Sequence, residues 1–418
     1  MVAQATLLDD LRAIVGGKQA YPPDESQAFA VDDMDPQIVV EPGSYEEVAA
    51  IMRHANGAGL AVIPLGGGTK RHIGNLPARY DIALSLSRLD EVVEHEPADL
   101  TVTCQAGIAV PELKRRLREH GQRVPFDVTA GQPSVGGSLA ANSNGPSRFA
   151  YGALRDFTIG MRVVTADGHI TRAGGKVVKN VAGYDLCKLY IGSLGTLGVI
   201  VEATFKVMPA ARRERAIRFR LHAPEDGCGL AVELCRRGLA FSHVELSSAG
   251  GGHEVGWFLE IVLAGSQGAV DRSEKELLGL APRFKAHLAT SDAAKETLGA
   301  GESIDDQLLC RLSVLPSRLA ALTRDVERTR SPRIIADPVS GVLSASWQAV
   351  DESNVVERAR TIAAKYSATC FVERCSPELK RRIDVFGDPP PAFELMRRVK
   401  HQFDPKGILS PGRFVGRV

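Results

Sequence analysis

The stretch PLGGGTKRHIG, residues 64–74, decides how the first half of this chain is interpreted. It continues LAVIPL (residues 60–65), an apolar run of the length expected for a buried strand. The three glycines at residues 66–68 let successive backbone amides point into one concavity, and a backbone without Cβ atoms can touch an anion. Thr69 adds a hydroxyl group and Lys70 a positive charge. The loop has the composition of a phosphate-binding turn, and a glycine-rich surface turn is the plain alternative.

The spacing of this loop excludes two widespread nucleotide-binding motifs. The GxxxxGK[ST] spacing of a Walker A loop is absent. A GxGxxG pattern fits the glycines only loosely, and the next element is predicted as a strand instead of a helix that would cap a phosphate. A phosphate site at this loop would therefore be neither a Walker A nor a Rossmann site.

A second segment, GQPSVGGSLAANSNGPSRFAYG (residues 131–152), is nearly free of bulky side chains where a short helix is predicted to begin. Small residues there would let a flat ring or a phosphate lie against the backbone, with free amides facing it. Tight packing of a helix on a sheet uses the same residues. On its own, this segment favours packing.

A third segment, KVVKNVAGYDLCKLYIGSLGTLGVIVEATF (residues 176–205), places Gly192, Gly195 and Gly198 in a loop that passes directly into a strand. Backbone groups of such a loop could hold an adenine or a ribityl chain. Lys176 is equally explained as a solvated charge.

The rest of the pattern predicts two domains of the α+β class. Before residue 210, the pattern predicts several strands and a capped helix that starts at Ser44 and stops at Gly57. The pair Asp167-Gly168 predicts a hairpin between two of the strands. After Pro209 the chain becomes basic and poor in glycine, which predicts a boundary near Ala210. The second half then alternates strands and helices, as in an antiparallel sheet backed by helices with two ferredoxin-like halves, although no sequence repeat proves a duplication.

Composition excludes several classes of protein. With 418 residues the chain is too long for one ordinary core. The 51 lysine and arginine residues nearly balance the 50 aspartate and glutamate residues. The net charge of +1 therefore provides no overall electrostatic attraction to nucleic acid or to an anionic membrane. Seven scattered cysteines without a CxxC pair argue against a disulfide framework, a zinc site or an iron–sulfur cluster held by this chain alone. No apolar run of about 18 residues and no signal peptide are present, so we expect a cytoplasmic protein.

Together, the three segments resemble the FAD-binding domain shared by vanillyl-alcohol oxidases, D-lactate dehydrogenases and glycolate oxidases, the PCMH-type family. The family's pyrophosphate loop corresponds to residues 66–70, its TIGG segment to residues 134–137 and its GSEGTLGII segment to residues 192–200, with Leu194 in place of glutamate. Its AG turn corresponds to Ala106-Gly107. The resemblance covers about residues 30–210 and rests on three separated motifs in the right order.

Within that family the chain is most similar to the FAD-binding E subunits of bacterial glycolate oxidase (glycolate dehydrogenase). KVVKNVAGYDLCKL and the tail LMRRVKHQFDPKGILSPGRFVG (residues 395–416) carry this similarity. The resemblance implies an FAD domain at residues 30–210, an α+β cap domain at 211–394 and a tail at 395–418 that packs back on the FAD domain. The family usually has NPGR in the tail, whereas this chain has Ser410 before Pro411, which puts a contact of the amide in doubt.

The resemblance also implies the cofactor and its ligands. The cofactor is FAD, held non-covalently because Thr69 stands where relatives with covalent flavin often have a histidine; His72 is expected at the rim. The residues predicted to bind FAD are Leu65, Gly66, Gly67, Gly68, Thr69, Lys70, Ser134, Val135, Gly136, Gly137, Ser138, Gly195, Gly198, Val199 and Ile200.

What the chain lacks shapes the functional expectation. Relatives that oxidise 2-hydroxy acids directly carry HxGDGNxH-like and GEHG segments for a metal, and neither occurs here. No metal site and no catalytic base are predicted, and Lys406 and Arg413 of the tail are the candidates for binding a carboxylate.

The expected protein is an FAD-dependent oxidoreductase acting on CH-OH donors, as one subunit of a hetero-oligomeric glycolate oxidase. Its expected partners are a flavin- and metal-containing catalytic subunit and an iron–sulfur subunit that passes electrons to a quinone-like acceptor, with membrane association only through those partners. Two alternatives stay open: a self-sufficient dehydrogenase of another hydroxy acid or alcohol, and a non-catalytic flavin subunit.

Overall fold

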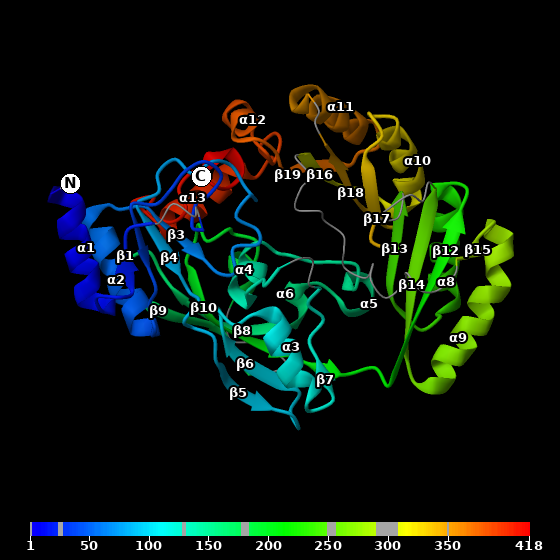
Figure 1. Ribbon diagram of the computed structural model, residues 1–418, viewed down its shortest axis with the longest axis horizontal. Coiled ribbons are helices and arrows are strands. Elements are labelled where there is room, and N and C mark those ends of the chain that lie inside the picture. The colour runs from blue at the N-terminus through cyan, green and yellow to red at the C-terminus, as the bar shows by residue number, and fades with distance from the viewer. Residues whose placement is uncertain are drawn as a thin grey trace. The chain divides into compact units, whose positions relative to one another are not determined.

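The structure is a computed structural model that describes residues 2–23, 28–127, 131–176, 184–248, 256–289, 308–348 and 351–418. It divides into two compact units (Figure 1). The first unit comprises Met1–Ser143, Leu154–Pro209 and Lys380–Val418, and the second comprises Asn144–Ala153 and Ala210–Leu379. The units are therefore interleaved in sequence: a ten-residue piece from within the first half belongs to the second unit, and the C-terminal segment returns to the first.

The described strands of the first unit are β1 (Ala20–Tyr21), β2 (Ile38–Val40), β3 (Val62–Leu65), β4 (Ile82–Ser85), β5 (Val92–Glu96), β6 (Thr101–Gln105), β7 (Gln122–Arg123), β8 (Thr158–Val164), β9 (Ile170–Gly174), β10 (Val199–Lys206) and β11 (Met208–Pro209). Its described helices are α1 (Val2–Val15), α2 (Tyr45–Ala58), α3 (Val110–Arg118), α4 (Val135–Ala140), α6 (Leu154–Phe157), α7 (Cys187–Tyr190), α13 (Phe393–Phe403) and η3 (Val415–Arg417), and α12 (Pro377–Arg382) spans the boundary of the units.

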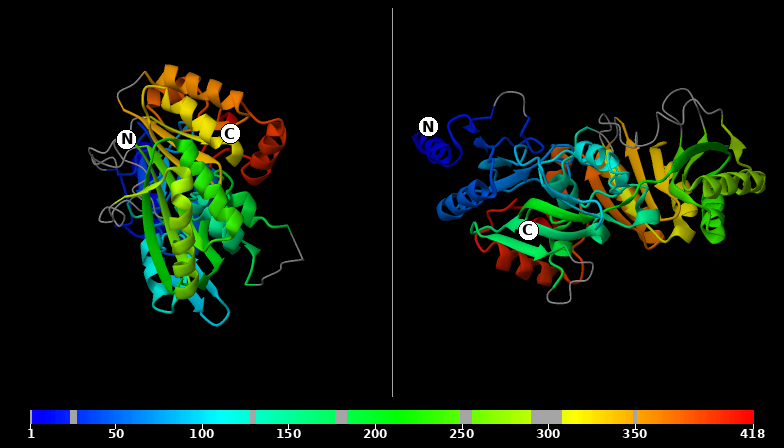
Figure 2. Two further views of the ribbon diagram at one scale, coloured as in Figure 1. Left: turned by 90° about the vertical axis from the view of Figure 1, so that its right-hand side faces the viewer. Right: turned by 90° about the horizontal axis from the view of Figure 1, so that it is seen from below.

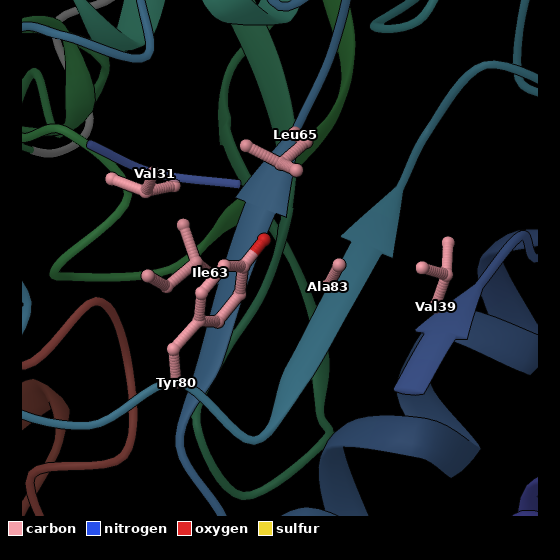
Figure 3. Close-up of a cluster of buried hydrophobic side chains, with 6 residues drawn as sticks. All are labelled: Val31, Val39, Ile63, Leu65, Tyr80 and Ala83. Carbon is pink, nitrogen blue, oxygen red and sulfur yellow. The ribbon is translucent and has the colours of Figure 1, made fainter. Parts of the chain in front are cut away.

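The first unit contains a four-stranded and a five-stranded sheet. The four-stranded sheet has the order β1-β2-β4-β3, in which β2, β4 and β3 run parallel. A cluster of buried side chains, including Ile63, Tyr80 and Ala83, packs on one face of these strands (Figure 3). The Tyr80 hydroxyl donates to the carbonyl of Phe29 at 2.8 Å, which ties residues near 30 to the same core. The parallel strands therefore end at a common edge, where β3 delivers the glycine loop.

The second sheet is antiparallel, with the order β5-β6-β10-β8-β9. Its central strand β10 is buried along its length except at Lys206, and it carries two buried polar residues, Glu202 and Thr204, among its apolar side chains. The hairpin predicted at Asp167-Gly168 joins β8 to β9, with Val164 opposite Ile170 and Gly168 at φ +78°. The two sheets give the first unit two subdomains.

Helix α2 shows one small correction to the sequence analysis. Its capping box is as predicted, because Ser44 Oγ accepts from the Glu47 amide at 3.1 Å and the Gly43 amide donates to Glu47 Oε2 at 2.6 Å. The helix was expected to stop at Gly57 but continues to Ala58, and Gly59 is the residue that turns left-handed, at φ +68°. A glycine followed by alanine permits another helical residue, so the second glycine of the pair ends the helix.

The elements of the second unit are α5 (Arg148–Tyr151), β12 (Arg213–Leu221), α8 (Pro224–Arg237), β13 (Phe241–Ser248), β14 (Trp257–Gly265), α9 (Gln267–Leu280), η1 (Ala281–Phe284), β15 (His287–Leu288), β16 (Leu308–Ser313), α10 (Pro316–Glu327), β17 (Arg333–Asp337), β18 (Val342–Trp347), α11 (Glu352–Lys365) and β19 (Thr369–Arg374). They form one antiparallel sheet of order β15-β12-β14-β13-β17-β18-β16-β19.

This sheet consists of two ferredoxin-like halves. Each half runs strand, helix, two strands, helix, strand, and each has the order 4-1-3-2 when its strands are numbered from its own start. The halves join where β13 pairs with β17. Helices α8 and α9 pack against β12 and β14 (Figures 1 and 2). The buried apolar pairs Ile217–Ile261 and Phe219–Leu259 join these two strands. The predicted α+β class is confirmed, and the duplication left open by the sequence is visible in the topology.

The C-terminal segment docks on the first unit through main-chain and charged contacts. The Val62 amide of β3 donates to the Ile408 carbonyl at 2.8 Å, and the Ser410 amide donates to the Val62 carbonyl at 2.9 Å. The carboxylate of Asp404 accepts the amides of Ile408 and Leu409 at 3.0 and 2.8 Å. These bonds extend the parallel sheet by one short segment of the tail.

None of the described helices is long and apolar enough to cross a lipid bilayer.

We predict that Asp404→Ala destabilises the first unit by about 3 kcal/mol, because it leaves the two buried amides unpaired and removes the carboxylate that lies 2.7 Å from the Lys400 ammonium, which keeps only carbonyl acceptors. Denaturant unfolding of the FAD-free chain measures this. The control is Glu394→Gln, whose exposed pair with Arg397 contributes at most about 1 kcal/mol. Equal unfolding midpoints for the two variants would show that the tail is not docked through Asp404.

Candidate functional site

A pocket within the first unit collects the three small-residue segments. It contains about 890 Å³ of empty space, its open side included. Its described lining residues are Val31, Ile63, Pro64, Leu65, Gly66, Gly67, Gly68, Thr69, Lys70, Arg71, Leu86, Ala106, Ser134, Gly136, Gly137, Ser138, Ala140, Ala141, Leu194, Gly195, Gly198, Ile200 and Arg413. Of the residues predicted to bind FAD, only Val135 and Val199 are absent from this lining.

The fold explains why these segments meet. Strand β3 ends at Leu65, so the glycine loop leaves the sheet at the carboxyl end of its parallel strands, where ligands of open α/β sheets bind. The second segment enters α4 and the third enters β10, and Gly136 N donates to the Ala106 carbonyl at 2.7 Å while Leu194 N donates to that of Ala140 at 3.0 Å. Segments distant in sequence are therefore held together by backbone hydrogen bonds.

The glycines of the loop serve a purpose that the sequence did not indicate. A Cβ on Gly66 would lie 1.9 Å from Ser134 Oγ, and a Cβ on Gly67 would lie 1.9 Å from the Gln132 carbonyl oxygen. These positions require glycine because two protein segments touch there, in addition to any contact with an anion. Gly68 adopts φ +71°, the left-handed conformation that side chains disfavour.

The loop also presents unused hydrogen-bond donors. Among the described residues, none accepts a hydrogen bond from the amides of Gly67, Gly68 or Thr69. Successive amides that turn into one concavity, with a left-handed residue among them, form an anion-binding nest. The residues that carry these amides are at least partly exposed, so a ligand can reach the donors, and their arrangement fits a phosphate.

The second segment departs from the expectation of free amides. Its Val135 and Gly136 amides donate to the carbonyls of Ile108 and Ala106, and the Gly137 amide donates to Ser134 Oγ at 3.2 Å. Val135 is fully buried and is not part of the pocket lining. This segment therefore contributes a smooth wall of small residues, and the donors come from the glycine loop.

The third segment supplies the opposite wall. Gly195 adopts φ +74°, and a Cβ on it would lie 3.3 Å from Ser410 Oγ in the tail. A Cβ on Gly198 would lie 2.5 Å from Val163 Cγ1. Leu194, at the position where the resembling family has glutamate, lines the pocket with φ +53°. Residues 177–183 of the motif KVVKNVAGYDLCKL lie outside the described residues.

The tail adds one residue that the predicted cofactor ligands omitted. Arg413 lines the pocket, and its guanidinium donates to the carbonyls of Arg71, Ile73 and Asn75. Burial lowers the pKa of Arg413 to about 10. The other proposed carboxylate ligand, Lys406, instead donates to the Asn56 carbonyl at 2.7 Å and is not part of the lining. The tail motif was the signal for Arg413, but nothing in the sequence distinguished it from Lys406.

The substitution of serine for the usual asparagine in that motif also has a visible result. The hydroxyl of Ser410 is buried and has no hydrogen-bond partner among the described residues. The Ser410 hydroxyl therefore does not replace the contact that the longer amide side chain of an asparagine would make.

The residues present fit FAD. The nest of amides with Lys70 suits a pyrophosphate, while Ile63, Leu65, Leu86 and Ile200 offer apolar surface for flat rings. Among the described residues, no group of three or more histidine, cysteine, aspartate or glutamate side chains is arranged to hold a metal ion.

Comparisons with known proteins agree with this geometry. Residues 36–174 match the family described as FAD binding domain, and residues 388–414 match the FAD linked oxidases, C-terminal domain. The D-lactate dehydrogenase of Archaeoglobus fulgidus is 27% identical over 98% of this chain and 99% of its own length. The glycolate oxidase subunit GlcD of Bacillus subtilis is 33% identical over 44% of this chain and 39% of that subunit.

Among solved structures, p-cresol methylhydroxylase with substrate bound has a TM-score of 0.74, covering 99% of this chain and 97% of that one, with 16% identity. At that identity the likeness concerns the fold. Fold, pocket and family matches together define a flavoprotein whose cofactor is FAD. The first unit has the fold of PCMH-type FAD-binding proteins, and the chain is an FAD-dependent oxidoreductase.

We predict that Gly67→Ala abolishes FAD binding, because its methyl group cannot coexist with the Gln132 carbonyl and the loop must separate from its neighbour. Flavin absorbance of the purified protein measures the effect. Gly57→Ala is the matched control, since a Cβ there meets nothing within 4 Å. If Gly67→Ala retains a full complement of FAD, the loop is only a turn.

A second prediction concerns the mode of attachment. The described lining contains no histidine, cysteine or tyrosine, and Thr69 occupies the expected attachment position. Acid precipitation should therefore leave all the FAD in the supernatant. Flavin that remains with the precipitate would contradict non-covalent binding.

Proposed function

We propose that this chain is the FAD-binding subunit of a 2-hydroxy-acid dehydrogenase complex that oxidises glycolate to glyoxylate. Electrons would leave through an iron–sulfur subunit toward a quinone-like acceptor. The observation that supports the substrate class is that one relative matched over nearly the whole chain is named for D-lactate, others for D-2-hydroxyglutarate, and a further one for glycolate, all 2-hydroxy acids. The cofactor pocket of the first unit supports the redox role.

The chain's own residues bind and orient the cofactor. The amides of Gly67, Gly68 and Thr69 would hold the pyrophosphate, and the wall formed by Gly136, Gly137 and Ala140 would let the dinucleotide lie against the backbone. Bound flavin supplies the acceptor for a hydride from the substrate carbon. The described lining contains no histidine or carboxylate that could take the hydroxyl proton.

The need for a partner follows from that missing group. As a hydride leaves, negative charge develops on the substrate oxygen, and its electrostatic stabilisation is commonly among the largest catalytic effects. The sequence lacks the HxGDGNxH-like and GEHG segments that hold a metal for this purpose in related dehydrogenases. A catalytic partner with flavin and metal would supply it, in the cytoplasm or at a membrane reached through the other subunits.

A second candidate function is a self-sufficient dehydrogenase of another 2-hydroxy acid. The match to D-lactate dehydrogenase over 98% of this chain favours it, because that relative has a similar length. The two functions differ in whether the isolated chain reduces its own flavin.

We predict that glycolate or D-lactate added anaerobically to the isolated holo-chain bleaches the flavin slowly or not at all, and that turnover appears only with the partner subunits. Absorbance during single turnover measures this, with dithionite as the control that the flavin can be reduced. Rapid bleaching of the isolated chain by either acid would establish the self-sufficient dehydrogenase instead.

A further inference from the structure

Three cysteines gather at one edge of the sheet of the second unit. Cys310 lies in β16, Cys370 lies in β19, and Cys375 directly follows β19. In the register of these antiparallel strands, Cys310 stands opposite Val372 and Cys370 stands opposite Leu312. Residues that stand opposite each other, or two apart on one strand, point to the same face of a sheet. Cys310 and Cys370 are therefore diagonal neighbours on one face, and their side chains hydrogen-bond to each other.

The two thiols differ in their exposure to solvent. Cys310 is completely buried, whereas Cys370 is partly exposed. Strand β19, which carries Cys370, is the last strand of the described sheet and has β16 as its neighbour. A small oxidant that arrives from solvent therefore meets Cys370 first.

The surroundings favour the thiolate form of Cys370. The hydrogen bond from Cys310 lowers the pKa of Cys370, and the guanidinium of Arg360 lowers it further, against the effect of burial. Arg360 belongs to α11, which packs against β16 and β19 (Figure 1). The same hydrogen bond raises the pKa of Cys310, and burial adds to this effect, so that thiol keeps its proton. Because the thiolate is the nucleophile, Cys370 is the reactive member of the pair.

Four other cysteines lack this combination. Burial raises the pKa of Cys187 to about 11 and that of Cys228 to about 12, and it also raises the pKa of Cys104. Cys235 is exposed, but burial of its thiol raises its pKa as well. Cys235 is therefore a reachable cysteine without a stabilised thiolate, and it serves as the comparison for Cys370.

We propose that Cys370 and Cys310 form a peroxide-sensitive thiol pair, in which Cys370 is oxidised first and Cys310 converts the product into a disulfide. The Cys370 thiolate attacks one oxygen of hydrogen peroxide, so that an S–O bond forms, the O–O bond breaks, and the leaving hydroxide takes up a proton as water. The Cys310 sulfur then attacks the Cys370 sulfur, an S–S bond forms, and the S–O bond breaks. The departing hydroxide takes the Cys310 proton.

The balance is that the two thiols lose two electrons and peroxide is reduced to two waters. The described lining of the cofactor pocket contains no cysteine, so this site is separate from FAD. The inference is therefore independent of the substrate proposed above.

The experiment treats the full chain, with its FAD, with hydrogen peroxide at a concentration close to that of the protein. Free thiols are then alkylated, and peptides from a digest without reductant are measured by mass spectrometry. We expect the Cys310 and Cys370 peptides to be joined, with a mass lower by two hydrogen atoms than their sum. Oxidation of Cys370 should be several-fold faster than oxidation of Cys235, and a thiol reductant should restore both members of the pair.

Variants separate the roles of the two thiols and of the cation. Cys310→Ser should leave a sulfenic acid on Cys370, which dimedone traps, and should form no cross-link. Arg360→Met should slow the oxidation of Cys370 several-fold. Arg358→Met removes an exposed cation from the same helix and should leave the rate unchanged. Cys235→Ser should form the cross-link as the unaltered chain does.

Three results in the unaltered chain would overturn the proposal. They are oxidation of Cys370 that is no faster than that of Cys235, a cross-link from Cys310 to Cys375, and a sulfenic acid that persists on Cys370 without a cross-link. Because these results come from the unaltered chain, a variant that fails to fold does not decide the test. Equal rates for Arg360→Met and Arg358→Met would contradict the role of Arg360.

Discussion

The close contact between the glycine loop and the segment before α4 is the constraint on which the rest of the first unit depends. Gly66 meets Ser134, and Gly67 meets the backbone of Gln132, at distances that leave no room for a Cβ atom. This contact brings the end of a parallel sheet against an element packed on the antiparallel sheet. Residues of both elements line the pocket, to which the loop contributes the amides of Gly67, Gly68 and Thr69.

The C-terminal segment completes this arrangement from far along the chain. Arg413 and Asn75 tie the tail to residues 71–75, directly after the glycine loop, and Lys400 donates to the Thr196 carbonyl at 2.8 Å in the third segment. A cofactor site built from separated segments needs such a brace, because short loops without side-chain bulk have little packing of their own. The position of the docked tail therefore affects the shape of the pocket.

The second unit is stabilised in a different way. Its two ferredoxin-like halves form one sheet with helices on the apolar face, so its stability comes from an ordinary core of side chains. It contributes none of the described residues that line the cofactor pocket. The described residues that line the cofactor pocket therefore all belong to the first unit.

The sequence by itself determined the elements and most of the pocket. Hydrophobic runs, the capping box at Ser44 and the hairpin at Gly168 act through neighbours in the chain, so their patterns were sufficient. The three small-residue segments could be assigned to one cofactor because their order and spacing resemble a known domain. Only the tertiary structure decided which donors are free, since the amides of Val135 and Gly136 are used by Ile108 and Ala106 from another part of the chain. It also decided that Arg413, and not Lys406, reaches the pocket. Both outcomes depend on contacts between residues far apart in the sequence, which no local pattern of residues encodes.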